Sequence, residues 1–280
     1  MHSTPYRPQS RSGLVYCWVV GCCVLAIAGL VGCATTSGGG DSASVAQDIV
    51  TDSDRSPERK RAAIRLELAL AYFQEGKNTI ALDEVKMALA TDPSYFDAYN
   101  LRGLIYMALN DQGLAQASFT RALGLRPKDP DVLHNLGWLK CQQSQFGQGI
   151  AHFEEALSNP QYGARAKSLM TLGLCQIRAG LKPQAEANLL KAYEYDAGNP
   201  VTGFNLASLM FDRGDLQRAR FYIRRLNNSS FGNAESMWLG MRIEQRLGNT
   251  EAVSQLGLQL EKRFADSPQT ALWRRRAFDE

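Results

Sequence analysis

Small residues recur along this chain at a nearly constant interval. In one series the successive sequence numbers differ by 34, 34, 36, 34 and 33, and its members are Ala69, Gly103, Gly137, Gly173, Ala207 and Gly240. A second series follows the first at one constant offset and repeats its steps in the same order: Ala81, Ala115, Gly149, Ala185, Ala219 and Ala252. Because the two series share even their irregular steps, they indicate one structural unit that is repeated six times.

Each unit is expected to form two helices. A large apolar residue follows every member of the second series four positions later, so that both lie on one helix face: Val85, Phe119, Phe153, Leu189, Ile223 and Leu256. Helix pairs of about 34 residues with small residues at the crossing resemble tetratricopeptide repeats. We therefore expect an all-α solenoid of about six repeats over residues 58–265 and a C-terminal tail or cap over 266–280. The alternative is an unrelated helical bundle, which would not require a constant interval.

One step of the repeat is two residues longer than its neighbours. The surplus must lie between Ala156 and Gly173, because the spacing on either side of these residues is regular. The segment Asn159-Pro160-Gln161-Tyr162-Gly163 is rich in residues that favour loops. We expect the two extra residues in this segment, between the third and fourth repeats.

The N-terminal segment up to Cys33 reads as a lipoprotein signal. A polar stretch with Arg7 and Arg11 precedes an almost wholly apolar run over residues 13–30, as in a secretory signal peptide. The run ends at Leu30-Val31-Gly32-Cys33, which resembles the lipobox of bacterial lipoproteins. The resemblance implies cleavage after residue 32, acylation of Cys33 and a lipid anchor, and Ala34 after the cysteine favours the outer membrane. The alternative is an uncleaved inner-membrane anchor, since about 18 apolar residues can just span a bilayer.

Residues 33–57 are expected to form a flexible tether behind the lipidated cysteine. The stretch from Thr35 to Ser42 is made of small and polar residues, and few large apolar side chains follow before Pro57. Such a segment buries too little apolar surface to offset the entropy of ordering its backbone. The repeat domain would then stand off the membrane on this tether.

The charge and motif content exclude several classes of function. The formal net charge of +3 falls to near +1 without Arg7 and Arg11, and the C-terminal basic run, Arg274–Arg276, is short. A nucleic-acid partner is therefore not expected. The processed chain retains two histidines, His134 and His152, and has no nucleotide-binding, protease or hydrolase motif. We expect no enzymatic activity, no cofactor, no metal and no small-molecule substrate.

Two cysteines remain after processing, Cys141 and Cys175. They would lie in an oxidising compartment and could pair, but the sequence alone does not place their Cα atoms within bridging distance. Both fall on apolar helices, which favours two small unpaired residues in the core.

The first helix of each repeat should line a groove. In tetratricopeptide-repeat proteins this helix faces the concave side of the solenoid, and the resemblance carries that role to an unusually apolar set: Leu70, Phe73, Leu104, Met107, His134, Trp138, Leu174, Ile177, Phe204, Phe211 and Met241. Exposed apolar patches mark interaction sites, so we expect a groove that binds a hydrophobic peptide. The alternative is that tight curvature buries these residues between neighbouring helices.

A more specific resemblance rests on several short strings. Asn135-Leu136-Gly137-Trp138, Asn205-Leu206-Ala207, the run from Trp238 to Ile243 and Gly257-Leu258-Gln259-Leu260 are similar to segments of the PilF/PilW family of type IV pilus lipoproteins. The likeness runs from Cys33 to Ala265. It implies a pilotin that binds subunits of the pilus secretin and promotes their insertion and assembly in the outer membrane. Arg102 and the tail Leu272-Trp273-Arg274 depart from the family pattern. The alternative function is an outer-membrane repeat lipoprotein that scaffolds peptidoglycan enzymes or other envelope enzymes.

Overall fold

The computed structural model describes residues 51–278, which belong to one compact unit. The expected signal peptide, Cys33 and most of the expected tether lie outside these residues. The described part is all-helical, with thirteen α-helices, one short 3-10 helix and no strand. The helices are α1 (Pro57–Gln74), α2 (Asn78–Thr91), α3 (Phe96–Ala108), α4 (Gln112–Leu125), α5 (Pro130–Gln142), α6 (Phe146–Ser158), α7 (Arg165–Arg178), α8 (Lys182–Tyr195), α9 (Pro200–Asp212), α10 (Leu216–Asn227), α11 (Ala234–Arg246), α12 (Thr250–Arg263) and α13 (Pro268–Arg275), and η1 (Asp52–Asp54) precedes them.

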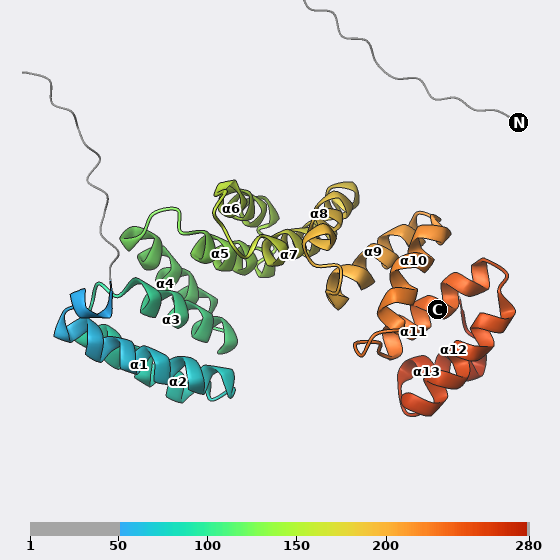
Figure 1. Ribbon diagram of the computed structural model, residues 1–280, viewed down its shortest axis with the longest axis horizontal. Helices are drawn as coiled ribbons and strands as arrows, with labels where there is room; N and C mark the ends of the chain where they lie inside the picture. Colours follow the sequence, from blue (N-terminus) through green and yellow to red (C-terminus); the bar gives the residue numbers. More distant parts are fainter. Residues whose placement is uncertain (1–50, 279–280) are drawn as a thin grey trace, which may run out of the picture. The chain divides into compact units, whose positions relative to one another are not determined.

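The first twelve helices form six pairs of neighbours, α1 with α2 through α11 with α12 (Figure 1). The small residues of the first series stand where the two helices of a pair cross. A Cβ atom added to Gly103 would lie 2.3 Å from Cε1 of Phe119, and one added to Gly173 would lie 2.7 Å from Cγ of Leu189. The solenoid of six repeats that the spacing predicts is therefore confirmed.

Substitution of Gly103 by alanine should be destabilising, by about 1–3 kcal/mol, because the added methyl group overpacks the α3/α4 crossing. Gly124 supplies a matched control in α4, since a Cβ atom there meets nothing within 4 Å. Gly124→Ala should stabilise the helix by about 0.5–1 kcal/mol, because alanine loses less backbone entropy than glycine. Urea unfolding of both variants measures the two shifts. Shifts of the same sign would contradict the assigned crossing.

The two helices of every repeat are joined by the same tight turn. Its central residue has a left-handed backbone conformation, at Gly76, Asn110, Ser144, Gly180, Gly214 and Gly248. In the first turn the N–H of Gly76 donates to the carbonyl of Phe73 (3.0 Å) and that of Lys77 to the carbonyl of Tyr72 (2.9 Å), which satisfies the last carbonyls of α1. Glycine is favoured there because it lacks a Cβ atom. The constant turn explains why the two series of small residues keep one fixed offset.

The connections between repeats differ in length. α2 and α3, α4 and α5, and α8 and α9 are separated by four residues, whereas α10 and α11 are separated by the six residues 228–233 and α6 and α7 by the six residues 159–164. The connection over 159–164 is where the sequence places the two surplus residues. The connection holds its neighbours together, because Nη1 of Arg165 donates to the carbonyls of Leu157 (2.8 Å) and Asn159 (3.0 Å).

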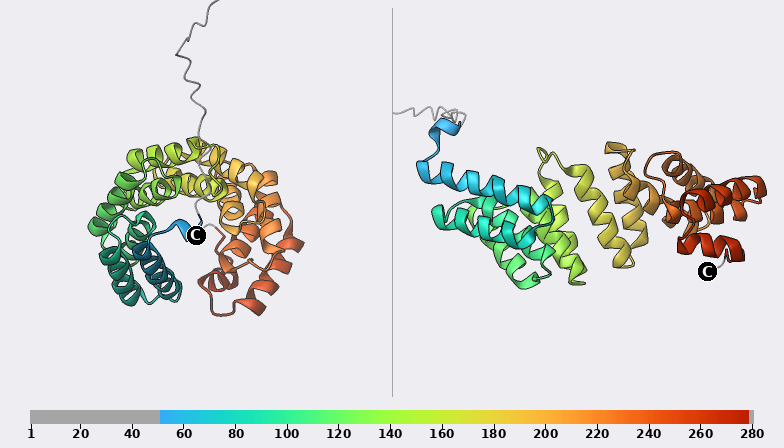
Figure 2. Two further views of the ribbon diagram at one scale, coloured as in Figure 1. Left: turned by 60° about the vertical axis from the view of Figure 1, so that its left-hand side comes forward. Right: turned by 90° about the horizontal axis from the view of Figure 1, so that it is seen from below.

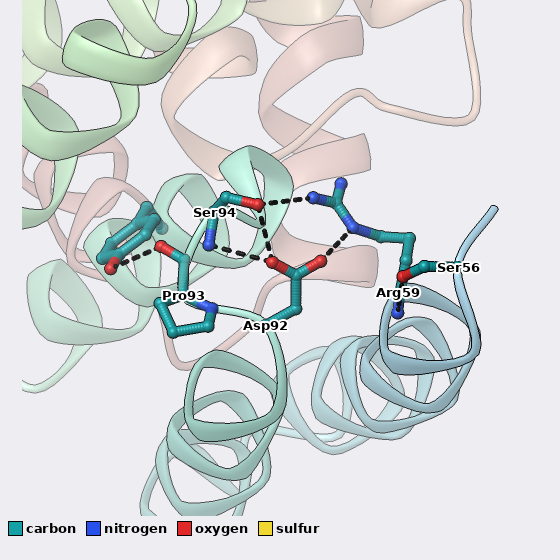
Figure 3. Close-up of polar contacts among 6 residues, drawn as sticks. Ser56, Arg59, Asp92, Pro93 and Ser94 are labelled. Atoms are coloured by element: carbon teal, nitrogen blue, oxygen red, sulfur yellow. Dashed lines mark hydrogen bonds and ion pairs between the residues drawn. The ribbon is translucent and has the colours of Figure 1, made fainter.

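A polar cluster joins the first repeat to the second (Figure 3). Asp92, in the connection between α2 and α3, forms an ion pair with Arg59 of α1. It also accepts hydrogen bonds from the backbone N–H (2.9 Å) and the hydroxyl (2.7 Å) of Ser94. Burial alone would raise the pKa of Asp92, but the hydrogen bonds from Arg59 and Ser94 outweigh it and hold that pKa below its usual value. The cluster fixes the start of α1 against the next repeat.

The odd-numbered helices line the inner side of the described solenoid. Each of them from α1 to α9 contacts the next odd-numbered helix as well as its own partner. Among the described helices, successive even-numbered ones make no comparable contacts. The stack therefore curves toward the odd-numbered helices, and the repeats follow one another along an arc (Figure 2).

The last repeat is covered by α13 and the residues after it. A Cβ atom on Gly257 would lie 2.3 Å from the indole ring of Trp273, so α13 packs directly on α12. The ring of Phe278 stacks on Trp238 of α11 at a centroid distance of 5.2 Å. This segment shields the apolar end of the solenoid as a terminal cap does in other repeat proteins.

Candidate protein-binding groove

Eight of the eleven side chains expected in the groove retain accessible surface. We call these eight the groove wall: Leu70 of α1, Phe73 of α1, Leu104 and Met107 of α3, Trp138 of α5, Leu174 and Ile177 of α7, and Phe204 of α9. Leu70 is 44% exposed and the others are partly exposed. Most of them also pack against the cores of their own repeats, which holds them in place. The groove wall is thus a fixed apolar surface on the odd-numbered helices.

The remaining three expected residues are buried and offer almost no surface to a ligand. His134 is 5% exposed, Phe211 6% and Met241 0%. Phe211 is covered by Arg242 and Arg246, whose guanidinium carbons lie 5.1 and 5.0 Å from its ring centroid. Met241 belongs to the core under α13. These three side chains are buried as the alternative reading expects, His134 and Phe211 by contacts with the next repeat and Met241 beneath α13.

His134 belongs to a buried polar network between the third and fourth repeats. Its Nδ1 lies 2.7 Å from Oγ of Ser168 on α7, and that hydroxyl lies 2.9 Å from the hydroxyl of Tyr162. The imidazole also meets the ring of Phe153 edge-on at 5.3 Å. Burial, together with the nearby charge of Lys167, lowers the pKa of His134 from 6.5 to about 4. The neutral imidazole is therefore the form that fits this site.

The free energy of unfolding should fall in mild acid, because the buried His134 is harder to protonate in the folded protein than in the unfolded chain. In the unfolded chain His134 binds its proton near pH 6.5, whereas in the folded chain it does so only near pH 4. The contribution of the neutral His134 to the free energy of unfolding is therefore complete above pH 6.5 and is lost as the pH falls from 6.5 toward 4. Between pH 7 and pH 5 this amounts to about 2 kcal/mol. The comparison of urea unfolding at both pH values for the wild type and His134→Gln isolates the contribution. The same loss in both proteins would assign it to other groups.

The two remaining cysteines are joined by a disulfide. Cys141 of α5 and Cys175 of α7 are bonded, with their Cα atoms 5.7 Å apart, and both residues are fully buried. The expectation of two unpaired core residues is therefore wrong as to pairing, although their burial is as expected. Their separation of 34 residues was the missed signal, because it is close to the 36-residue step between these two repeats and therefore places the two cysteines near each other on neighbouring inner helices.

Three arginines that the sequence analysis did not single out lie on the aromatic rings of Trp138, Phe146 and Phe211. The guanidinium carbon of Arg178 lies 6.0 Å from the ring centroids of both Trp138 and Phe146. Arg242 and Arg246 flank Phe211 as described above. The apolar wall therefore has cationic groups beside it over the third to sixth repeats. The arginines were overlooked because the groove prediction weighed apolar side chains alone.

The described residues also form an open cleft between α6, α7 and α8. Its volume is about 770 Å³, and its mixed lining includes Leu157, Leu169, Tyr195, Glu154 and Lys191. The described residues hold no cluster of three or more side chains suited to a metal ion. Within the same range, no helix has the length and apolar character needed to cross a membrane.

Comparisons with known proteins agree with this architecture. The tetratricopeptide-repeat family matches residues 66–130. The type IV pilus assembly protein PilF of Pseudomonas aeruginosa is 25% identical over 239 residues, which cover 85% of this chain and 91% of that protein. An uncharacterised protein of Haemophilus influenzae is 29% identical over 157 residues, covering 56% of this chain and 87% of its own length.

Two solved structures superpose on most of the chain. The structure of Pseudomonas aeruginosa PilF has a TM-score of 0.72 at 22% identity and covers 79% of this chain and 100% of that one. The structure of PilW, described as a widely conserved type IV pilus biogenesis factor, has a TM-score of 0.68 at 27% identity and covers 76% of this chain and 97% of that one. The protein is a tetratricopeptide-repeat protein that is similar over most of its length to the type IV pilus biogenesis proteins PilF and PilW.

Proposed function

We propose that this protein is an outer-membrane lipoprotein that acts as a pilotin: it binds subunits of the type IV pilus secretin and promotes their insertion and assembly in the outer membrane. The observation that carries the proposal is the groove wall, an apolar surface on a solenoid similar to PilF over 85% of this chain. A free protein would not keep such a surface in water without a partner to cover it.

The shape of the groove wall favours a peptide segment as the ligand. Its eight residues are distributed over α1, α3, α5, α7 and α9, so they form a long surface rather than one enclosed cavity. An apolar surface of this kind suits an amphipathic helix or an extended segment whose apolar side chains lie along it. Met107 adds an adaptable side chain that can repack around a partner.

The proposed lipid anchor would locate the protein at the outer membrane. Cys33 at the end of the apolar run would carry the acyl chains, and residues 34–50 would connect it to the repeat domain. Each buried CH₂ group contributes about 0.8 kcal/mol, so two or three acyl chains hold a protein on a membrane without a spanning helix. A pilotin anchored in this way would carry a bound subunit to the membrane in which the ring assembles.

A scaffold for peptidoglycan or other envelope enzymes is the second candidate function. A docking surface for folded enzymes is expected to be more polar than the groove wall. The apolar wall therefore favours the secretin segment as partner. The two functions differ in a simple readout, because only the pilotin function makes secretin assembly depend on this protein.

Replacement of Cys33 by alanine should block both processing and secretin assembly. In a deletion strain complemented with the wild-type gene, secretin multimers should return to the outer-membrane fraction. The Cys33→Ala protein should remain an unprocessed precursor in the inner membrane, and the secretin should stay monomeric there. The measurements are mass spectrometry of the purified protein and fractionation of the secretin. Normal multimers in the deletion strain itself would reject the pilotin function, and a mature wild-type chain that retains residues 1–32 would reject the lipid anchor.

A further inference from the structure

The charges of the repeat region and the tail that follows it are divided unevenly between two halves. Residues 165–280 contain 17 lysines and arginines against 12 aspartates and glutamates, whereas residues 51–164 contain 12 against 14. The near-neutral total therefore conceals a basic second half. Since partners are selected by local potential rather than by net charge, the positions of these cations decide what they can bind.

Two of the arginines converge on one aromatic ring of the inner helices. Arg242 and Arg246 are one turn apart on α11, and both guanidinium groups lie about 5 Å from the centroid of the Phe211 ring on α9. Stacking on a ring holds a guanidinium in position while its N–H groups at the edge remain available to an acceptor. The Phe211 ring therefore holds two positive charges, each about 5 Å from its centre.

Neither arginine has a carboxylate partner in the described part of the chain. Nε of Arg242 donates to the carbonyl of Phe278 (3.1 Å), and Arg246 contacts Phe211 without any ion pair. Other arginines of the same half are neutralised: Arg224 pairs with Glu244 at 2.7 Å, and Arg213 pairs with Glu186 at 2.6 Å. Two positive charges held on one ring, without a carboxylate partner among the described residues, both stabilise an anion that reaches them.

The position of the pair relates this anion to the groove. α9 carries both Phe211, on which the arginines lie, and Phe204 of the groove wall, and α9 contacts α11 directly. A segment lying along the wall toward α11 would therefore bring its own polar groups to the arginine pair. On the far side of α9, Arg178 also lies on an aromatic residue of the third repeat, Trp138, and has no ion pair in the described residues.

We infer that Arg242 and Arg246 bind a carboxylate of the peptide segment that occupies the groove wall. The ligand is then an apolar segment that carries an aspartate, a glutamate or its own C-terminal carboxylate at the end facing α11. This inference rests on the proposed function, because it takes the groove wall as the place where the segment binds. It adds the acidic group that selects and orients the segment, since a guanidinium and a carboxylate match in charge and in planar geometry.

The test uses peptides from the secretin subunit as the probe. Overlapping peptides that span the mature subunit are titrated against the purified repeat protein, and the tightest one is remade in two forms. One form has each acidic residue replaced by its amide, and the other has an amidated C-terminus. The protein variants are Arg246→Gln, Trp138→Ala and, as a matched control, Arg225→Gln. Arg225 lies on the outer helix α10, stacks on Tyr193 at 5.8 Å and likewise has no ion pair in the described chain.

The expected result is a selective loss. Arg246→Gln should weaken the acidic peptide about tenfold, because a charge-assisted hydrogen bond is lost, and it should discriminate less between the acidic and amide forms than the wild type does. Arg225→Gln should bind like the wild type. With the wild-type protein, weaker binding of the peptide with side-chain amides would identify an aspartate or glutamate as the carboxylate. Weaker binding of the peptide with an amidated C-terminus would identify its C-terminal carboxylate. Equal wild-type affinity for the acidic and both amide forms would overturn the inference.

The outcomes also separate this inference from the proposed function. One outcome is that Trp138→Ala weakens binding while Arg246→Gln still distinguishes acidic from amide peptides as the wild type does. In that case the groove wall is the binding surface, but the arginine pair is not the anion site. If neither variant weakens any peptide, the groove itself is not the binding surface and both proposals fail. A tenfold loss in the Arg225→Gln control would show a general electrostatic effect and overturn the specific assignment.

Discussion

Reduction of the Cys141–Cys175 disulfide should lower the free energy of unfolding of the repeat domain by about 3–4 kcal/mol. The bond joins residues that are 34 positions apart, so it restricts a loop of that length in the unfolded chain. It also ties α5 to α7 at a step where the repeats otherwise rely on nearest-neighbour packing.

The measurement is urea unfolding with and without a reductant, for the wild type and for a Cys141→Ala/Cys175→Ala variant. The wild type should lose stability in reductant, and the variant should be insensitive to it at the lower value. A matched control is the exposed substitution Leu258→Ala, which should leave the reductant effect intact because Leu258 is 67% exposed on α12. Identical unfolding midpoints for the oxidised and reduced wild type would contradict the expected role of the disulfide.

The repeat frame could be predicted from the sequence because it depends on contacts within one repeat. Gly103 must be small since Phe119 of the same repeat fills the space beside it, and the turn at Asn110 fixes the distance between the two helices. These requirements recur at fixed spacing, so they are visible without any structure. The six-residue connection over 159–164 is visible for the same reason, as a break in the spacing.

The candidate site was less predictable because its surface depends on contacts between repeats. Position within the first helix places Trp138 and Phe211 on the inner side, but the next repeat decides whether each is exposed. Arg242 and Arg246 of the sixth repeat cover Phe211, whereas Trp138 keeps part of its surface. The pairing of Cys141 with Cys175 depends on the same neighbour relation. Cys175 stands two positions before the residue that corresponds to Cys141 in the next repeat, so a comparison that included neighbouring positions would have found this pair.

Truncation of Trp138 to alanine should weaken binding of the secretin subunit about thirtyfold, which corresponds to the roughly 2 kcal/mol that a buried aromatic anchor contributes. Trp138 is partly exposed on α5 and lies in the middle of the groove wall. Its ring is also positioned by the core below it, which includes Phe153 and Cys141. A ligand that covers this ring would remove its remaining surface from water.

The fold and the groove can be separated by a core variant. Phe119 is completely buried in the second repeat and touches no solvent. Phe119→Ala should therefore cost about 3–5 kcal/mol of stability and lower binding only as far as the protein unfolds. Leu174→Ala, on the groove wall of α7, should also weaken binding of the secretin subunit, but less than Trp138→Ala does, because leucine buries less area than tryptophan.

The most direct test of the groove is the affinity of the secretin subunit measured beside the melting temperature for Trp138→Ala and Phe119→Ala. The groove predicts that Trp138→Ala loses about thirtyfold in affinity while it remains folded at the temperature of the assay, and that Phe119→Ala shows the larger drop in melting temperature. Wild-type affinity in a folded Trp138→Ala protein would contradict it and would direct attention to the cleft between α6, α7 and α8. Complete unfolding of Trp138→Ala would show that the wall at this position belongs to the core.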